Sequence, residues 1–247
     1  MQANLIPVDS EVLQGNVLAV EDFDASADFS AFEAEYLGRY RPVYVSCKIP
    51  LDRVGEVHSL EEHGFRLIEC QIRSAIILRA TTNIPAVPYA FEKVTTDAEL
   101  DAVLQAVGTA FENDRFSVDP LLPGDVSGAR YRSYVERSFR SPDEAVYRLY
   151  DPKEGTTVAF KTHRYVGNAE ALLLLGGVSR EYRRLGLGVV NTYAELNELR
   201  RLGITRAVTH FSAANYQIFN LEIGRLGYRV LKTFAVLRKI YPRSLAT

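Results

Sequence analysis

The sequence is poor in the features that define several common classes of protein. It has two cysteines, Cys47 and Cys70, which are too few for a disulfide framework. Each lies in an apolar, strand-like run, where we expect a buried reduced thiol. Lysine and arginine number 29 against 31 aspartates and glutamates, so no overall positive charge points to a nucleic-acid partner. The 4 histidines lack metal-ligand spacing, and we expect no metal site.

Long apolar runs are also missing. The first residues, MQANLIPVDS, lack the basic start and apolar core of a signal peptide. The most apolar run, Ala169–Val178, is too short to span a bilayer. We therefore expect a cytoplasmic protein without a membrane partner. The hydrophobic fraction of 47% and charged fraction of 24% are those of a globular protein.

A linker is predicted near the end of the first third of the chain. Thr81–Tyr89 carries Pro85 and Pro88 among small residues, which indicates a boundary between an N-terminal α/β domain (1–90) and a second domain (91–247). We find no internal repeat. For the first domain the sequence predicts a strand over Val43–Ile49, a helix over Asp52–His63 that ends at Gly64, and strands over Phe65–Glu69 and Ser74–Leu78.

The second domain is predicted to alternate helices and strands. After a strand at Phe91, the expected elements are helices over Asp97–Phe111 and Ala129–Phe139, a hairpin of Ala145–Tyr150 and Thr156–His163, a strand over Glu170–Val178, a helix over Leu187–Leu202, a strand over Arg206–Phe211, a helix over Tyr216–Leu226 and a strand over Arg229–Arg238. A loop is expected over Phe116–Gly128. This order predicts an α/β sheet with helices on its faces. Because the last strand alternates in polarity, we expect it at an exposed edge that supports a homodimer.

The segment from Val178 to Gly188 runs from a strand end into a helix start. The first four amides of a helix lack internal partners, and the helix dipole adds positive potential there. Gly186 and Gly188 carry no Cβ, so a bulky anion can approach the backbone. Arg183 and Arg184, with Arg180, add cationic groups. The pattern predicts a diphosphate site.

Two further phosphate-binding motifs use the amides of a helix start in the same way. A dinucleotide site is disfavoured because Asn191 stands where the third glycine belongs and no acidic residue ends the next strand. An ordinary P-loop is excluded because Gly-Lys-Ser/Thr is missing. A glycine-capped helix start with surface arginines remains open.

Two ordered motifs resemble the Gcn5-related N-acetyltransferases, the GNAT superfamily, over roughly residues 91–239. The acyl-CoA motif is matched by Arg183, Gly186 and Gly188 after Val178, and a downstream motif by Asn215 and Leu226-Gly-Tyr228. The resemblance implies the GNAT fold, a mixed, splayed central sheet flanked by helices, here with a smaller N-terminal α/β domain. It also implies acetyl-CoA or another acyl-CoA as co-substrate and direct attack of an amine on the thioester.

In such enzymes two parallel strands part to admit the pantetheine arm. By resemblance these are Glu170–Val178 and Arg206–Phe211. The residues expected to bind acyl-CoA are Gly176, Gly177, Val178, Arg183, Arg184, Leu185, Gly186, Leu187, Gly188, Val189 and Asn215.

The family often has a tyrosine in the last helix that protonates the departing thiolate. Here the position is Glu222 when counted from Asn215 and Ile223 when counted back from Gly227, so the helix carries one extra residue. The catalytic candidates are Glu170, His210 and Tyr216. The alternatives are a solvated strand-end glutamate, a partly buried histidine and a packed aromatic ring.

The acceptor is suggested by upstream segments. Leu60–Ile68 and Arg115–Tyr131 resemble the TDP-fucosamine acetyltransferase-like sugar-nucleotide N-acyltransferases. The resemblance implies a TDP-linked amino-dideoxy sugar as acceptor, with Arg115, Asp119 and Tyr131 as candidate binding residues. For Asp119 and Asp125 turn formation is the alternative. Other open functions are acylation of a protein, polyamine or antibiotic amine, and a catalytically silent CoA-binding module.

Overall fold

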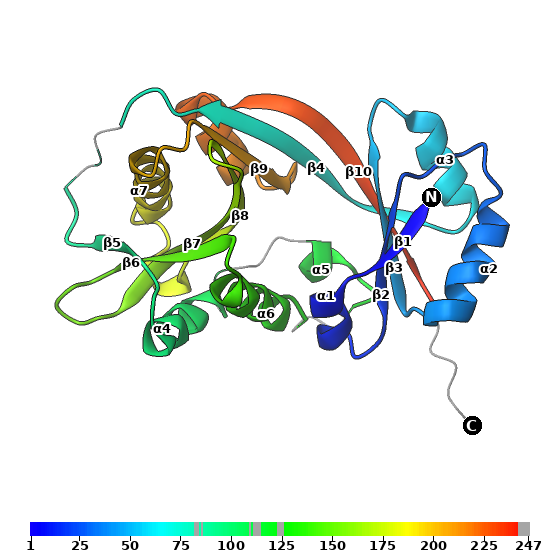
Figure 1. Cartoon of the computed structure of the whole chain (residues 1–247), viewed down its shortest axis with the longest axis horizontal. Helices are drawn as coiled ribbons and strands as arrows, with labels where there is room; N and C mark the ends of the chain where they lie inside the picture. The colour runs from blue at the N-terminus through cyan, green and yellow to red at the C-terminus, as the bar shows by residue number, and fades with distance from the viewer. Residues whose placement is uncertain (82–83, 85, 109, 111–114, 123–125, 242–247) are drawn as a thin grey trace.

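One mixed sheet runs through the whole molecule. A computed structural model describes the chain except residues 82–83, 85, 109, 111–114, 123–125 and 242–247. Its sheet has ten strands in the order β1-β2-β3-β10-β4-β9-β8-β7-β6-β5. The long strands β4 and β10 arch across the middle and join the two halves (Figure 1).

The strands are β1 (Gln2–Leu5), β2 (Val17–Glu21), β3 (Tyr44–Pro50), β4 (Arg66–Ile77), β5 (Ala90–Lys93), β6 (Glu144–Tyr150), β7 (Thr157–Val166), β8 (Glu170–Val178), β9 (Arg206–Ser212) and β10 (Arg229–Ile240). The helices are α1 (Pro7–Val12), α2 (Phe29–Tyr40), α3 (Val54–Glu62), α4 (Asp97–Val107), α5 (Arg115–Val118), α6 (Val126–Arg140), the 3₁₀-helix η1 (Arg180–Tyr182), α7 (Leu187–Arg201), α8 (Tyr216–Phe219) and the π-helix η2 (Asn220–Leu226). The predicted α/β fold class is confirmed.

Helices cover both faces of the sheet, as neighbouring residues of β7 show. Phe160 packs in one core cluster with residues of α4 and α6. The next residue, Lys161, points to the opposite face and bonds to Thr192 of α7. This part of the sheet therefore lies between two helical layers.

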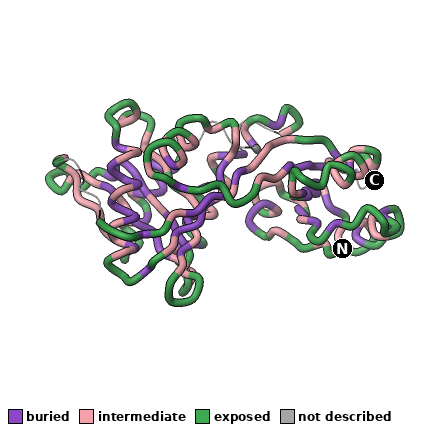
Figure 2. The backbone as a smooth tube through the Cα atoms, turned by 90° about the horizontal axis from the view of Figure 1, so that it is seen from above, coloured by how far each residue is buried: buried purple, intermediate pink, exposed green. Residues whose placement is uncertain are grey.

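Each half of the molecule has its own core (Figure 2). One cluster joins β2, β3, α2 and α3 to the last part of β10, with Leu18, Val45, Leu60, Phe65 and Leu237 almost fully buried. The remaining clusters lie around β6 to β9 and α7. Since β10 and β4 each contribute to the opposite half, the boundary at residue 90 stays a prediction.

The structure contains a repeat that the sequence does not show. The succession β2-α2-β3-α3-β4 has the same order and strand directions as β8-α7-β9-α8/η2-β10. β2 pairs parallel with β3, as β8 does with β9, and β10 crosses to β3 as β4 crosses to β9. The pair Gln71–Phe234 lies at the centre, with Cys70–Ala235 and Ile72–Thr233 placed symmetrically around it. We call the first succession repeat 1 and the second repeat 2.

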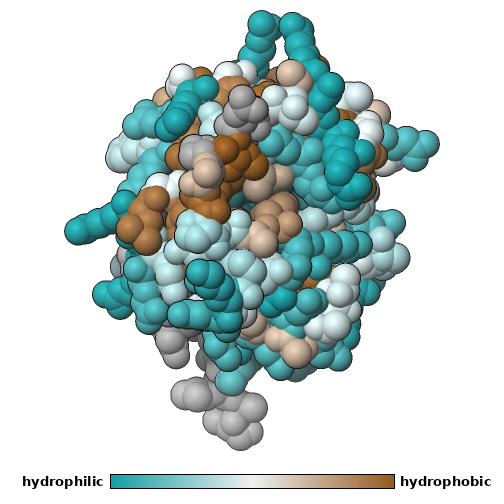
Figure 3. Space-filling view, turned by 90° about the vertical axis from the view of Figure 1, so that its left-hand side faces the viewer, coloured by the Kyte–Doolittle hydropathy of each residue, from teal (hydrophilic) through white to brown (hydrophobic). Residues whose placement is uncertain are grey.

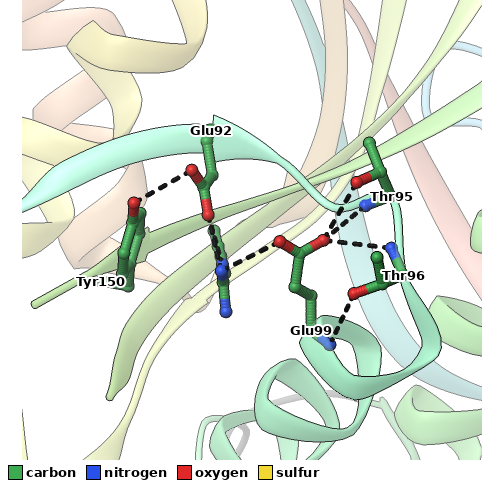
Figure 4. Close-up of polar contacts among 6 residues, drawn as sticks. Glu92, Thr95, Thr96, Glu99 and Tyr150 are labelled. Atoms are coloured by element: carbon green, nitrogen blue, oxygen red, sulfur yellow. Dashed lines mark hydrogen bonds and ion pairs between the residues drawn. The ribbon is translucent and has the colours of Figure 1, made fainter. Parts of the chain in front are cut away.

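Helix α4 is fixed at its start by a capping box (Figure 4). The Thr96 hydroxyl accepts from the Glu99 amide at 3.3 Å, and the Glu99 carboxylate accepts from the Thr96 amide at 3.0 Å. Arg148 of β6 then donates to Glu99 at 3.1 Å and to Glu92 of β5 at 2.6 Å. These bonds tie the beginning of α4 to the outer edge of the sheet.

Three expectations from the sequence are wrong. The two strands predicted over Phe65–Leu78 form the single strand β4, because pairing with β9 and β10 continues through the polar residues between them. The last strand is not at an edge, since β10 pairs with β3 on one side and β4 on the other. A homodimer built on that edge loses its basis. The loop predicted over Phe116–Gly128 contains α5 and the start of α6.

Within the described part of the chain, no helix is both long and apolar enough to cross a bilayer.

Candidate active site

The site begins where two parallel strands part. β8 and β9 pair over four positions, from Glu170–Arg206 to Leu173–Thr209. Beyond these, β8 continues to Val178 in register with β7 alone, and β9 continues to Ser212 in register with β4. In the described residues no β8–β9 pair follows Leu173–Thr209. The facing edges of Leu174–Val178 and His210–Ser212 are therefore available to another extended chain.

A bulge marks the parting point. The register between β7 and β8 shifts between Thr162 and His163, and the Leu175 amide donates to the Thr162 hydroxyl at 3.1 Å. A bulge bends its strand, which turns the end of β8 away from β9. Gly177 is required beyond it, because a Cβ there would lie 2.7 Å from the Cβ of Ala110. A Cβ at Gly176 would meet the Lys161 side chain at 2.7 Å.

The loop after β8 ends at an uncapped helix. Residues Arg180–Tyr182 form η1, and Arg184 and Gly186 have φ of 75° and 73° before α7 begins at Leu187. No side chain of the described residues caps α7, and its first turn holds no acidic residue. Orphan amides and the positive end of the dipole therefore meet at an exposed glycine, which suits an anion such as diphosphate.

The predicted linker packs beside this loop. Tyr89 meets Tyr182 of η1 edge to face, with ring centroids 6.5 Å apart. Ile84, Val87 and Tyr182 pack on the cluster that holds Leu187 of α7. Figure 3 views the molecule from this end and shows apolar groups gathered among polar ones. Leu185 of the loop is also largely exposed. The loop thus joins the uncapped helix start to apolar surface.

His210 lies one residue past the last β8–β9 pair. It pairs with Arg73 of β4, and its ring lies 6.5 Å from that of Phe234. Because side chains alternate along a strand, His210 faces away from α7, toward the side of the sheet that carries α5 and α6. Burial, together with Lys48 and Arg73, lowers the pKa of His210 to about 4. The imidazole is therefore neutral at pH 7.

The other catalytic candidates are not gathered at this point. Glu170 forms an ion pair with Arg206 in the paired part of the strands. Tyr216, in the first turn of α8, is 71% exposed. Asn215 caps α8 by accepting from the Ile218 amide at 3.1 Å. Roles for these residues in catalysis or cofactor binding stay predictions.

The candidate acceptor residues are spread over α5 and α6. Asp119 is buried in a bidentate ion pair with Arg238 of β10, at 2.7 and 2.9 Å. This pair accounts for its burial without a ligand. Tyr131 of α6 lies in the core, and Arg115 begins α5. Asp125 lies outside the described residues. In the described chain no three histidine, cysteine or acidic side chains form a metal-binding group.

The structure adds a buried polar group that the sequence left without a role. Glu222 of η2 is 8% exposed, and the Ser74 hydroxyl donates to its carboxylate at 3.3 Å. Lys161 lies nearby and forms an ion pair with buried Glu195 of α7 at 3.2 Å. Two signals in the sequence pointed to this residue. Glu222 stands at the family's tyrosine position when counted from Asn215, and the last helix carries one extra residue, which the π-helix accommodates.

Comparisons with known proteins place the fold. No family model and no curated protein matches the chain. Solved structures do. A GCN5-related N-acetyltransferase from Sphaerobacter thermophilus has a TM-score of 0.68 at 16% identity, covering 96% of this chain and 76% of that one. A tandem GNAT protein from the clavulanic acid biosynthesis pathway has a TM-score of 0.62 at 16% identity, and the match covers 92% of this chain and 76% of that one.

A glucosamine N-acetyltransferase region of a fungal multi-domain β-N-acetylglucosaminidase is also similar. Its TM-score is 0.66 at 12% identity, and the match covers 96% of this chain and 31% of that one. These likenesses and the parted strands lead to one conclusion: this chain has the fold of the GCN5-related N-acetyltransferases.

Proposed function

We propose that the protein is an acyl-CoA-dependent N-acyltransferase. The observation that carries the proposal is the continuous path from the parted end of β8, through a glycine-containing loop, to the uncapped start of α7. This path offers backbone groups for an extended amide-bearing chain at one end and an anion site at the other. Acetyl-CoA or another acyl-CoA has both parts.

The residues divide the binding between them. The backbone of Gly176–Val178 is available to the amides of the pantetheine arm. The amides from Arg183 to Val189, with the guanidinium groups of Arg183 and Arg184, hold the diphosphate. The amine of the acceptor then attacks the thioester carbonyl, and the protein contributes orientation and a path for the amine's proton. The candidate to accept that proton, directly or through water, is neutral His210 on the α5 and α6 side of the parted strands.

For the acceptor we propose an amino sugar carried on a nucleotide, with a TDP-linked amino-dideoxy sugar first in line. The segment Arg115–Tyr131 motivates this choice, and its described helices, α5 and the start of α6, lie on the face of the sheet toward which His210 points. The similar fungal region is described as a glucosamine N-acetyltransferase, which gives independent support for an amino-sugar acceptor. The acyl group is acetyl or a longer hydroxyacyl chain.

Mass spectrometry of products tests the whole proposal. Purified protein is incubated with a matrix of acyl-CoAs and amine acceptors that includes TDP- and UDP-linked amino sugars, a polyamine and a peptide. The proposal predicts an N-acylated amino-sugar nucleotide. Products from the peptide or polyamine alone would move the acceptor to another class. No product, with no thermal stabilisation by CoA or acetyl-CoA, would contradict the proposed activity.

The loop is tested separately by reversing charge. Arg183→Glu and Arg184→Glu are expected to weaken CoA binding by about 10- to 100-fold each, because charge-assisted hydrogen bonds contribute roughly 1.5–3 kcal/mol. Affinity for the acceptor is expected to change little. Lys153→Glu, in the exposed β6–β7 turn, is the matched control. Equal losses in all three variants would show that only overall charge matters.

A further inference from the structure

A buried carboxyl lies over the point where β8 and β9 part. Ser74, its hydrogen-bond partner, stands opposite Thr209 on the neighbouring strand. Thr209 in turn is the last residue of β9 that pairs with β8. The Glu222 carboxyl, held on Ser74, therefore lies at the level of the opening on the face covered by α7 and η2.

Charged and polar groups from β4, β7 and α7 act on this carboxyl. Lys161 of β7 stands opposite Gly176 on the parted segment of β8, so its ammonium approaches from the far side of the opening. Glu195 of α7 forms an ion pair with Lys161, and its negative charge raises the pKa of Glu222. Tyr228, two residues after η2, is 3% exposed, and its hydroxyl has no hydrogen-bond partner among the described residues.

Repeat 1 shows that the fold does not need a carboxyl here. The Tyr228 amide donates to the Glu222 carbonyl at 2.9 Å, and its counterpart, the Phe65 amide, donates to the Leu60 carbonyl at 3.0 Å. Leu60 thus corresponds to Glu222. By the same register Leu237 corresponds to Ser74, because each stands nine residues after its aromatic residue and opposite equivalent strands.

The two members of this comparison differ in chemistry. Leu60 and Leu237 are both fully buried in the apolar core of repeat 1. The core beside β8 and β9 has a glutamate from η2 and a serine from the exchanged strand β4 in the corresponding places. Burying a carboxyl costs free energy that a leucine pair avoids. The π-helix adds to the contrast, since the helix of repeat 1 is regular over Val54–Glu62 while η2 carries the extra residue that aims Glu222 at the sheet.

Burial also sets the protonation of Glu222. It raises the pKa of this carboxyl to about 7, against the lowering effects of Lys161 and the Ser74 hydroxyl. A substantial fraction is therefore neutral near pH 7, with a proton to donate.

Given the proposed function, on which this step rests, we infer that Glu222 is the proton donor to the departing CoA thiolate. The amine nitrogen forms the C–N bond to the acyl carbon, and the C–S bond breaks with its electron pair on sulfur. Glu222 gives its proton to that sulfur, which leaves as the thiol. The attacking nitrogen loses its extra proton to water or His210 and becomes the amide nitrogen. The Glu222 carboxylate takes a proton back from solvent. Ser74 positions the carboxyl, and Lys161 stabilises negative charge beside it.

The test is the pH dependence of kcat in four proteins, measured by thiol release at saturating acetyl-CoA and acceptor. In the unchanged protein kcat is expected to fall above about pH 7, as Glu222 loses its proton. This fall is the basic limb of the pH profile. Glu222→Gln is expected to lower kcat by about 100-fold and to remove this basic limb, with CoA affinity kept. Ser74→Ala removes a bond that lowers the pKa, so its limb is expected at higher pH.

The control is Glu62→Gln, an exposed glutamate of α3, the helix that corresponds to η2 in repeat 1. It is expected to keep both kcat and the limb. The inference is overturned if Glu222→Gln, shown to be folded by circular dichroism, keeps the basic limb or loses less than about threefold in kcat. Failure of the proposed function looks different, because the unchanged protein then neither binds CoA nor releases thiol.

Discussion

At the scale of single residues, burial explains the two unusual ionisable groups. Glu222 and His210 lie near the parted strands on opposite faces of the sheet, and burial disfavours the charged form of each. It raises the pKa of the acid to about 7 and lowers the pKa of the base to about 4. Near pH 7 His210 is therefore neutral and a substantial fraction of Glu222 is neutral, at the place where an amine and a thioester would meet in the proposed reaction.

This burial has a consequence for stability. The folded-state pKa of Glu222 lies above its usual 4.5, at about 7, so its contribution is favourable at low pH and is lost as the pH rises through that window. At roughly 1.36 kcal/mol per pH unit, the loss amounts to about 3 kcal/mol above pH 7. Glu222→Gln removes it. Urea unfolding is expected to show the variant more stable than the parent at pH 8 and close to it at pH 4. An equal difference at both pH values would contradict this assignment.

At the scale of elements, the backbone conformation of the loop between β8 and α7 matters for the proposed CoA binding. Gly186 has a φ of 73°, and Gly203, which ends the same helix, has 86°; neither has neighbours that a Cβ would meet within 4 Å. Alanine at either position is expected to cost about 1–2 kcal/mol of stability through backbone strain alone.

Of these two changes, Gly186→Ala alone lies at the proposed anion site. Gly186→Ala is expected to weaken CoA binding severalfold, because a Cβ and a shifted backbone disturb the helix start, whereas Gly203→Ala is expected to bind as the parent does. Isothermal titration of both variants checks this. Similar affinity in the two would mean that the helix start does not hold the diphosphate.

The elements also show what the sequence can predict. β8 has the predicted bounds, and α7 differs by one residue, because an all-apolar run and two glycines give clear signals. β4 was predicted as two strands because polar residues interrupt its pattern while pairing on both edges continues. The burial of Glu222 was hidden, since it depends on a π-helix and on Ser74, distant in the chain. The register of helix residues alone does not reveal which side chain meets the sheet.

At the scale of the whole molecule, the two repeats complete each other. β4 supplies repeat 2 with the strand beside β9, and β10 supplies repeat 1 with the strand beside β3. The sequence shows no repeat, because the two cores hold different side chains.

Because β4 and β10 are exchanged, we predict that neither half folds on its own. A chain beginning at Phe91 lacks β3 and β4, which leaves β10 without a partner on either side. We expect this fragment to aggregate in gel filtration and to unfold without cooperativity. The full chain is expected to elute as a monodisperse species and to unfold cooperatively. A monodisperse, CoA-binding fragment would instead establish residue 90 as a true domain boundary.

Among the described residues, the features of the proposed donor site occur in repeat 2 and not in repeat 1. β2 stops at Glu21, one residue after its last pair with β3, and an acidic loop leads to α2, where Asp28 accepts from the Ala31 amide at 3.0 Å. The corresponding place in repeat 2 is the uncapped start of α7 after the extended end of β8. A carboxylate already occupies the anion site of repeat 1, so a diphosphate is repelled there.

Calorimetric titration of the full chain with CoA is the decisive measurement for the donor site. We predict binding at one site per chain, weakened by Arg183→Glu and unaffected by Asp28→Asn in repeat 1. No binding would contradict the assignment of the β8–α7 loop to acyl-CoA. Two equivalent sites, or binding lost on changing Asp28 and kept on changing Arg183, would contradict its placement in repeat 2.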